Sequence, residues 1–434
     1  MDNKYYKTII NKIHKEKTNI NELSKLIDKY LIPQELEKKN NAEVSTPYSL
    51  RKDMLDKIPP EFWTKENTVF EPCSGKGGFV IDIIDRFMNG LKDKYPEEKK
   101  RYKVIVEKLL YFSDINNTNI FICKLLIDPK NKYKINYNEG NTLELNIKEK
   151  WGVDGFDAVI GNPPYNGKGI NTGHTIWQFF TFKSLKYWLL NNGYLLYVHP
   201  SGWRKIESYK IENEYLNELM IKNNNMLYLE IHNTKDGLKT FNCGTKYDWY
   251  LIKKEKQNNN KTIIIDDKNN KIKMNISNMK YIPNNNIELY YKLFGDNNLV
   301  YDRCYTHSST KKTVSKIENK EFKYKILHST TQKGERYLYS NNNKDGLFDK
   351  SKIMFGDSGI NNCVIDFEGK IGCSEHIICL KINSKKEGNK IKNILENKKF
   401  KDFINACSWS NYQINWKIFK SLKNFDEIKK ILDI

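Results

Sequence analysis

The sequence predicts an α/β fold, in which a mostly parallel sheet forms the first part of the chain and a separate α+β unit follows it. Two observations predict this division. Short apolar runs alternate with helical segments between residues 68 and 198, and such alternation requires crossover connections and hence a parallel sheet. After residue 255 the pattern changes to short β-like runs separated by loops rich in Asn, Lys and Gly. A chain of 434 residues is long enough for two or three domains.

The first part of the chain contains an N-terminal extension and one α/β domain. Residues 1–40 are charged, and their Ile and Leu residues recur at helical spacing, so we expect a helical extension. The α/β domain is placed at residues 41–255. Its expected elements are a strand, a Gly-rich turn and a helix at 68–88, a strand at 109–112, a helix at 116–127, a strand at 156–160, a helix at 177–190 and a strand at 194–198.

The C-terminal part, residues 256–434, is expected to be an α+β unit that binds a polyanion. Its β-like runs lie at 262–265, 353–356, 363–365 and 377–382, and a helical tail runs from about 391 to 434. The whole chain has a net charge of +20, and residues 256–434 contribute 33 basic and 20 acidic side chains to it. An excess of +13 in this part favours a polyanionic partner. AT-rich codons are an alternative source of the lysines.

Several classes of protein are not expected. The eight cysteines include no CxxC pair, so we expect reduced thiols, no metal site and a cytoplasmic protein. Residues 1–17 lack the apolar core of a signal peptide, and no run approaches 18 apolar residues, so no membrane association is expected.

The Gly-rich turn is the first candidate site. Glu71 ends a strand, and Gly75 and Gly77 follow before the next helix begins. A glycine turn at the carboxyl end of a parallel strand lets the backbone approach a ligand closely. No Lys-Ser/Thr follows Gly77, so this is not a phosphate-binding Walker loop. The acid of Glu71 favours a cationic ligand, although such a turn can also serve packing alone.

Asp114 ends the next strand and is the second candidate. An acid at this position can bind the two hydroxyls of a ribose. Alternatively, it is a solvated residue that caps the helix starting near Asn116.

The third candidate is the loop Asn162-Pro163-Pro164-Tyr165, which directly follows the strand at 156–160. Two prolines fix the backbone and remove donors, which leaves carbonyl groups free to accept hydrogen bonds. The side-chain oxygen of Asn162 and the carbonyl oxygen of Pro163 would then form two acceptors suited to a planar NH2 group. Tyr165 offers a flat face on which a ring can stack.

These motifs, in this order, resemble the S-adenosylmethionine-dependent amino-methyltransferases whose catalytic loop reads Asp/Asn/Ser-Pro-Pro-Tyr. The resemblance covers residues 45–255 and is closest to the gamma group of N6-adenine DNA methyltransferases of restriction–modification systems. It implies a Rossmann-like methyltransferase domain at 41–255 and a DNA target-recognition domain at 256–434.

The resemblance also assigns roles to further residues. Thr46 and Pro47 are similar to the element that closes over the methionine end of the cofactor, and Asp114-Ile115 to the residues that hold its ribose and adenine. Asn141, followed by Thr142, stands where the family usually has an Asp that binds the adenine amino group, and an Asn oxygen can still accept that bond. Phe241 is the candidate for an aromatic residue that packs on the target base opposite Tyr165; a core position is the alternative.

The activity implied is site-specific transfer of a methyl group from S-adenosylmethionine to N6 of an adenine flipped out of duplex DNA. Methylation of another amino group is the alternative, in RNA, at N4 of cytosine or on protein glutamine. So is a catalytically silent DNA-specificity subunit. A separate cognate restriction endonuclease is a further partner that the resemblance allows.

Overall fold

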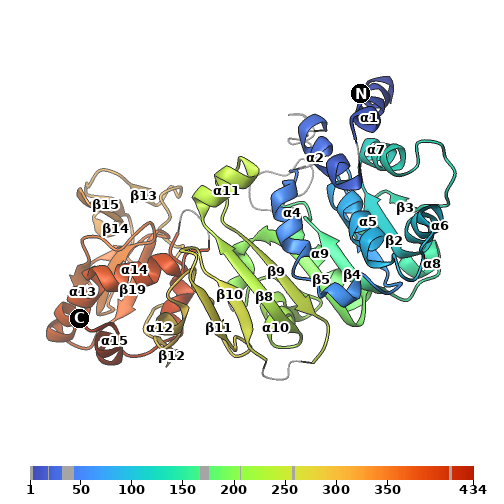
Figure 1. Ribbon diagram of the computed structural model, residues 1–434. Helices are drawn as coiled ribbons and strands as arrows, with labels where there is room; N and C mark the ends of the chain where they lie inside the picture. The colour runs from blue at the N-terminus through green and yellow to red at the C-terminus, as the bar shows by residue number, and fades with distance from the viewer. Residues whose placement is uncertain are drawn as a thin grey trace. The chain divides into compact units, whose positions relative to one another are not determined.

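The computed structural model describes residues 3–17, 19–31, 44–166, 175–205, 207–256, 260–409 and 413–434. The chain forms two compact units, Met1–Asn278 and Met279–Ile434 (Figure 1). The sequence placed the division at residue 255, and the structure places it 23 residues later. The reason is that two strands between residues 260 and 278 extend the sheet of the first unit. The second unit therefore carries 28 basic and 18 acidic residues. Its net charge of +10 is half of the total of +20, and it is smaller than the +13 counted for residues 256–434.

The first unit is built on a sheet of nine strands within the described residues, and its centre is parallel as expected. Strand β9 is antiparallel to both of its neighbours, β5 and β8. From one edge to the other the strands are β11 (Lys271–Met274), β10 (Thr262–Ile265), β8 (Asn225–His232), β9 (Tyr247–Lys253), β5 (Leu189–Pro200), β4 (Phe156–Gly161), β1 (Val69–Glu71), β2 (Leu110–Asp114) and β3 (Asn136–Glu139).

Helices and aromatic side chains cover this sheet on both faces. On one face, Val69 and its neighbours pack into a large apolar core shared with helices α1, α2, α5 and α7. On the other face Phe70 stacks on Phe156 and meets the ring edges of Trp151 and Trp188. The helices of this unit are α1 (Asn3–Glu16), α2 (Ile20–Tyr30), α4 (Tyr48–Leu55), α5 (Gly78–Gly90), α6 (Glu98–Val104), α7 (Asn117–Ile127), α8 (Ile147–Trp151), α9 (Trp177–Lys183), α10 (Leu216–Ile221) and α11 (Thr234–Phe241).

The N-terminal extension is helical where it is described, and it belongs to the first unit. Helix α1 packs against α7, and α2 packs against α5, as the ribbon also shows (Figure 1). Leu23 and Ile27 of α2 are buried in the common core. Residues 32–40 of the expected extension lie outside the described residues.

Two expectations in the first unit were incomplete. The helix expected at 177–190 ends earlier, because α9 passes through one π-helical turn at Ser184–Trp188 and β5 already begins at Leu189. Strands β3, β8, β9 and β11 of the nine-stranded sheet were not expected.

The strand order places ligand-binding positions at one edge of the sheet. The chain runs from β1 outward to β2 and β3, and then returns to the other side of β1 to form β4 and β5. Open α/β sheets bind ligands at the carboxyl ends of the strands where the order reverses in this way. Glu71, Asp114 and Gly161 are the last residues of β1, β2 and β4, so the three candidate motifs follow neighbouring strands.

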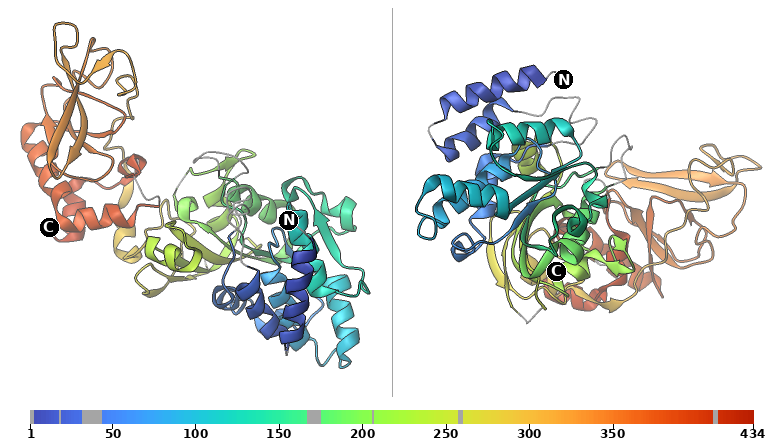
Figure 2. Two further views of the ribbon diagram at one scale, coloured as in Figure 1. Left: turned by 90° about the horizontal axis from the view of Figure 1, so that it is seen from above. Right: turned by 90° about the vertical axis from the view of Figure 1, so that its right-hand side faces the viewer.

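The second unit is α+β, as expected. It contains a four-stranded sheet of order β13-β15-β14-β18 and a three-stranded sheet of order β17-β16-β19. The sequence missed the β14–β15 hairpin. In both orientations of Figure 2 the hairpin lies at the end of this unit away from helices α13 to α15. The elements are α12 (Ile287–Tyr291), β12 (Phe294–Asn297), β13 (Val314–Ser315), β14 (Tyr324–Thr331), β15 (Gly334–Ser340), β16 (Lys352–Gly356), β17 (Val364–Asp366), β18 (Gly372–Cys373), β19 (Ile377–Lys381), α13 (Lys385–Glu396), α14 (Lys398–Ala406) and α15 (Phe425–Leu432).

Among the helices described, none is both long and apolar enough to cross a bilayer.

Candidate functional site

The Gly-rich turn is shaped by two glycines with left-handed backbone. Gly75 has φ +50° and Gly77 has φ +87°, and Gly77 is the N-cap of α5. Residues that carry a side chain rarely adopt this left-handed backbone conformation. A Cβ atom on Gly77 would also lie 3.1 Å from Sγ of Cys123 on α7. Gly77 is therefore needed for the close packing of the turn against helix α7, whether or not the turn also contacts a ligand.

Asp114 fastens this turn to the end of β2. Its two carboxylate oxygens accept hydrogen bonds from the backbone N–H groups of Gly75 and Asn116, both at 2.8 Å. Burial raises the pKa of this carboxyl, and the two N–H donors act in the opposite direction. Asp114 thus lies beside the glycine loop and orders it, and its contact with a ribose stays a prediction.

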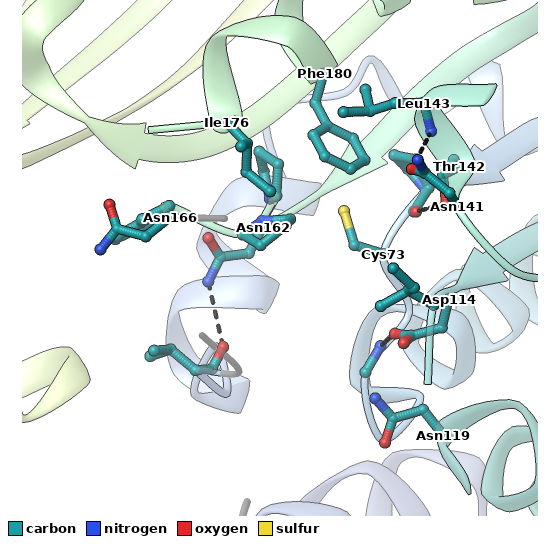
Figure 3. A pocket seen from close by; sticks show the side chains of 17 residues that line it. Cys73, Asp114, Asn119, Asn141, Thr142, Leu143, Asn162, Asn166, Ile176 and Phe180 are labelled. Carbon is teal, nitrogen blue, oxygen red and sulfur yellow. Dashed lines mark hydrogen bonds between the residues drawn. The ribbon is translucent and has the colours of Figure 1, made fainter. Parts of the chain in front are cut away.

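A pocket brings most of the predicted residues together (Figure 3). In the close view, Asn162 lies on one side, Asp114 on the other and Cys73 between them. The predicted residues in its wall are Gly75, Asp114, Ile115, Asn141, Thr142, Asn162, Pro163, Pro164 and Tyr165. Ile115 is 54% exposed, which leaves an apolar side chain available to a flat ligand in the pocket.

Asn162 has one end of its side-chain amide fixed and the other end free. Its Nδ2 donates to Oγ1 of Thr46 at 3.1 Å and lies 3.4 Å from the carbonyl oxygen of Val44. Its Oδ1 is buried and has no hydrogen-bond partner within the described part of the chain. An unpaired buried acceptor is costly, and here it belongs to a pocket wall, where a ligand N–H could satisfy it.

The other side of this pocket wall is apolar and aromatic. Ile176 and Phe180 line the pocket together with Tyr165. The hydroxyl of Tyr165 is buried without a partner among the residues described, and burial raises its pKa. Tyr165 is therefore a neutral aromatic ring beside the free oxygen of Asn162.

A second pocket adjoins the first and shares Val44, Cys73, Gly75 and Asn162 with it. Glu71 and Thr46 line this second pocket. Glu71 is only 2% exposed, and its Oε2 has no hydrogen-bond partner in the described ranges. Burial raises the pKa of this carboxyl well above its ordinary value, and the positive charge of Arg51 counteracts the shift. The second pocket thus contains an unsatisfied acid that suits a cationic group.

Asn141 and Thr142 line the first pocket but already have partners. Oδ1 of Asn141 accepts from Leu143 N at 3.1 Å, and its Nδ2 donates to Glu144. Thr142 donates to the carbonyl oxygen of Pro72 at 2.8 Å. Asn141 is a helix cap here, so its contact with an adenine amino group stays a prediction that would need the second lone pair of Oδ1.

Pro47 and Phe241 line neither of the two pockets. Pro47 is the N-cap residue of α4. Phe241 packs on the core of the first unit and meets Tyr247 edge-on, with ring centroids 4.9 Å apart. This is the core position that the sequence left open as the alternative, and contact of Phe241 with a base stays a prediction.

Sequence reasoning missed Arg51, Cys73, Ile176 and Phe180. Ile176 immediately precedes helix α9, and Phe180 lies four residues further along, within it. This i, i+4 spacing could have predicted that both side chains lie on the same apolar face. Cys73 lies inside the Gly-rich motif and could have been named with it. Arg51 carried no signal, because its burial at 2% exposure depends on partners far apart in the sequence.

Comparisons with known proteins agree with this arrangement. Residues 26–187 match the family model of the N-6 DNA methylases. An uncharacterized adenine-specific methylase of Mycoplasma pneumoniae (strain ATCC 29342 / M129 / Subtype 1) is 25% identical over 286 residues, which is 49% of this chain and 64% of that protein. The chain therefore aligns with less than two thirds of that relative.

Two solved structures have a similar fold over nearly the whole chain. The type IIL restriction–modification enzyme MmeI, solved in complex with DNA, has a TM-score of 0.53 at 9% identity, covering 95% of this chain and 72% of that one. A nuclease-deletion mutant of the type ISP enzyme LlaGI, solved with a DNA substrate mimic, has a TM-score of 0.52 at 12% identity, covering 93% and 56%. The family model and the relative confirm the expected resemblance to N6-adenine methyltransferases. The two solved structures agree with the expected α/β fold.

Proposed function

We propose that this chain, whose residues 26–187 match the family model of the N-6 DNA methylases, is a site-specific DNA methyltransferase that modifies N6 of adenine in duplex DNA. The methyl donor is S-adenosylmethionine. The observation that carries the proposal is the buried Oδ1 of Asn162, which faces a pocket without a partner among the described residues.

The chemistry of the two adjoining pockets fits S-adenosylmethionine. Asp114 and the exposed Ile115 suit the ribose and the adenine ring, and the unpartnered carboxyl of Glu71 suits the cationic methionine end. Gly75 has open space where a Cβ atom would lie, so its backbone can approach the ligand. When bound, the cofactor supplies a methyl group on a sulfonium centre.

Asn162 and Pro163 prepare the amine that is to be methylated. An exocyclic amino group is a weak nucleophile, because its lone pair is delocalised into the ring. Oδ1 of Asn162 and the carbonyl oxygen of Pro163 accept hydrogen bonds from its two N–H groups and shift electron density towards nitrogen. The amine can then become pyramidal, with its lone pair free for in-line displacement. With the cofactor bound, the N–C bond would form as the C–S bond breaks, the neutral thioether would leave, and the methylated nitrogen would release one proton to water. Fixed acceptors in a buried pocket lower the barrier through positioning and electrostatics.

The target base must leave the duplex to reach this position. N6 of a paired adenine is buried in the helix, so the enzyme flips the nucleotide out. The ring of Tyr165 replaces part of the lost stacking, and Ile176 and Phe180 add apolar contact in the same wall.

The second unit holds the DNA, and a basic segment at 311–336 supports this assignment. The segment has eight basic and three acidic residues, a net charge of +5 and half of the total for the unit. In the ranges described, none of its Lys or Arg side chains forms an ion pair, in contrast to Lys390, Lys399 and Lys420, which do. Cations that form no ion pair in the described ranges, located on strands β14 and β15 and in the neighbouring loops, suit the phosphates of a duplex.

Incubation with labelled S-adenosylmethionine tests the proposal. The purified protein and the labelled donor are incubated in parallel with unmethylated genomic DNA, total RNA and a protein extract. The DNA reaction should yield N6-methyladenine after digestion and chromatography of the nucleosides. Label in N4-methylcytosine, in RNA alone or in protein alone would overturn the assignment of the substrate. No transfer to any of these, together with retained DNA binding, would favour a silent specificity subunit.

A further inference from the structure

A buried arginine connects the N-terminal helix α2 to the loop that precedes α4. The guanidinium of Arg51 donates from Nε to Asp82 at 2.6 Å, from Nη1 to Asp28 at 2.8 Å and from Nη2 to Ser24 at 2.8 Å. These partners belong to α2 and α5, and the Arg51 side chain is 3% exposed. All three nitrogens of the guanidinium group are therefore engaged.

The same guanidinium also holds the backbone of Thr46. Nη1 of Arg51 donates to the carbonyl oxygen of Thr46. Asp28 adds a second tie to this loop, because its other carboxylate oxygen accepts from the backbone N–H of Tyr48 at 2.6 Å. Thr46 is 6% exposed, and its position is thus set from two sides.

Gly78 leaves the space that Arg51 needs. A Cβ atom at residue 78 would lie 2.8 Å from both Cζ and Nη1 of Arg51, which is closer than packed atoms approach. The last glycine of the Gly-rich turn therefore admits the arginine, and this gives it a purpose apart from contact with a ligand.

Thr46 in turn fixes the orientation of Asn162. A side-chain amide has a donor end and an acceptor end of nearly equal size, so a neighbouring group must determine which end faces the pocket. Oγ1 of Thr46 accepts from Nδ2 of Asn162 at 3.1 Å. The carbonyl oxygen of Val44 lies 3.4 Å from the same Nδ2 and can only accept. The two contacts together hold the donor end against Val44 and Thr46 and leave Oδ1 facing the pocket.

We propose that Arg51 and Thr46 are positioning residues for methyl transfer: Arg51, clamped by Asp28, Ser24 and Asp82, holds Thr46, and the hydroxyl of Thr46 keeps Oδ1 of Asn162 directed at the substrate amine. This inference rests on the proposed function of Asn162. It makes helix α2 part of the catalytic apparatus, although the helix supplies no catalytic residue.

Two variants of Thr46 separate orientation from cofactor binding. Thr46→Val keeps the shape and removes the acceptor, whereas Thr46→Ser keeps the acceptor. With saturating S-adenosylmethionine, Thr46→Val should lose about tenfold or more in turnover. Saturation separates this loss from any change in cofactor affinity, because Thr46 also lines the second pocket. Thr46→Ser should retain at least about half of the turnover. Unchanged turnover in Thr46→Val, or a loss that appears only in cofactor affinity, would overturn the role of Thr46.

Thr262→Val is a matched control. Thr262 is a buried threonine on β10, and its hydroxyl donates to the carbonyl oxygen of Met226 at 2.7 Å. This substitution should lower the melting temperature without affecting turnover. Arg51→Lys tests the contact between Arg51 and Thr46. One ammonium group cannot replace the three engaged nitrogens, so turnover at saturating S-adenosylmethionine should fall. A lower melting temperature with normal turnover would make Arg51 merely structural.

Melting temperatures of a double-mutant cycle test the contact without any assay of activity. If Thr46 acts on Asn162, then Thr46→Val should cost less stability in an Asn162→Ala background than in the wild type. Strictly additive losses would overturn the contact. If the wild-type protein methylates no adenine in DNA, the proposed function fails, and this cycle still decides whether Thr46 holds Asn162.

Discussion

The side-chain amide of Asn162 donates to the hydroxyl of Thr46 at 3.1 Å, and its oxygen is left buried without a partner in the described structure. This relationship orients an acceptor towards the pocket before any substrate arrives. Preorganised acceptors of this kind need no rearrangement during the reaction.

Asn162→Ala should therefore abolish turnover and leave cofactor binding nearly intact. Loss of one preorganised hydrogen-bonding group costs about 100-fold or more in turnover. Isothermal titration with S-adenosylmethionine should give a dissociation constant close to that of the wild type. A collapse of cofactor affinity would mean that Asn162 belongs to the cofactor site and not to the catalytic loop.

Glu71→Gln should weaken binding of S-adenosylmethionine by about tenfold near neutral pH, since a buried carboxylate that faces a cation is replaced by a neutral group. The wild-type affinity should also rise with pH. Burial raises the pKa of Glu71, and a bound cation favours the ionised carboxylate, so binding should be accompanied by release of a proton from this group. In titrations across a pH series, the logarithm of the affinity for S-adenosylmethionine should rise with pH for the wild type and rise less steeply for Glu71→Gln. Parallel slopes would show that another group is responsible.

The same carboxyl predicts an effect on stability in the absence of ligand. Because the pKa of Glu71 is higher in the folded than in the unfolded protein, its contribution to the free energy of unfolding decreases as pH rises above the ordinary value of 4.5. Glu71→Gln should therefore melt at a higher temperature than the wild type, and the difference should grow with pH. Thermal melts at several pH values measure this, and a constant or negative difference would contradict it.

The sequence was sufficient for those parts of the site that lie within continuous motifs. Strand, turn and helix occur together at Glu71 to Gly78, and the Asn162 loop follows its strand directly, so local patterns predict both. Parallel strand ends meet at one edge, which is why these distant motifs were expected to converge. The buried Arg51 could not be found in this way, since its partners on α2 and α5 are joined only by tertiary packing.

Sequence patterns were weakest where structure depends on a neighbouring strand. The β14–β15 hairpin has charged and polar residues on both strands and a register shift between Leu327 and Ser329, so its alternation is interrupted. Strand β10 was read correctly as β, but its assignment to the second unit was wrong because it pairs with β8 of the first sheet. Such pairing between distant segments leaves no local trace in the sequence.

Gly77→Ala should destabilise the protein more than Gly152→Ala. Both glycines have left-handed backbone, with φ +87° and +72°, so each substitution costs about 1 kcal/mol for the backbone. A Cβ atom on residue 77 would in addition lie 3.1 Å from Sγ of Cys123, whereas residue 152 has open space. Crowding should add about 1 kcal/mol at residue 77. Denaturant titrations of the two variants test this, and equal losses would contradict the crowding.

Lysines of the segment 311–336 should carry the salt-dependent part of DNA binding. Four exposed members can be changed to Gln together: Lys312, Lys316, Lys320 and Lys333. Each phosphate contact that is lost should reduce the slope of log affinity against log salt by about 0.9. Anisotropy with a labelled duplex should therefore give weaker binding and a flatter salt response, without a change in cofactor affinity.

Four exposed lysines on the helices of the same unit provide the matched control, since their substitution removes the same formal charge: Lys385, Lys386, Lys398 and Lys430. If the basic segment contacts phosphates, the helix variant should keep nearly the wild-type slope, because screened charges far from the DNA contribute little at moderate salt. Equal effects of the two variants would mean that only the total charge attracts DNA. In that case the lysines of 311–336 would be explained by AT-rich codons, the alternative that the sequence left open. The surface that contacts DNA would then have to lie elsewhere on the protein.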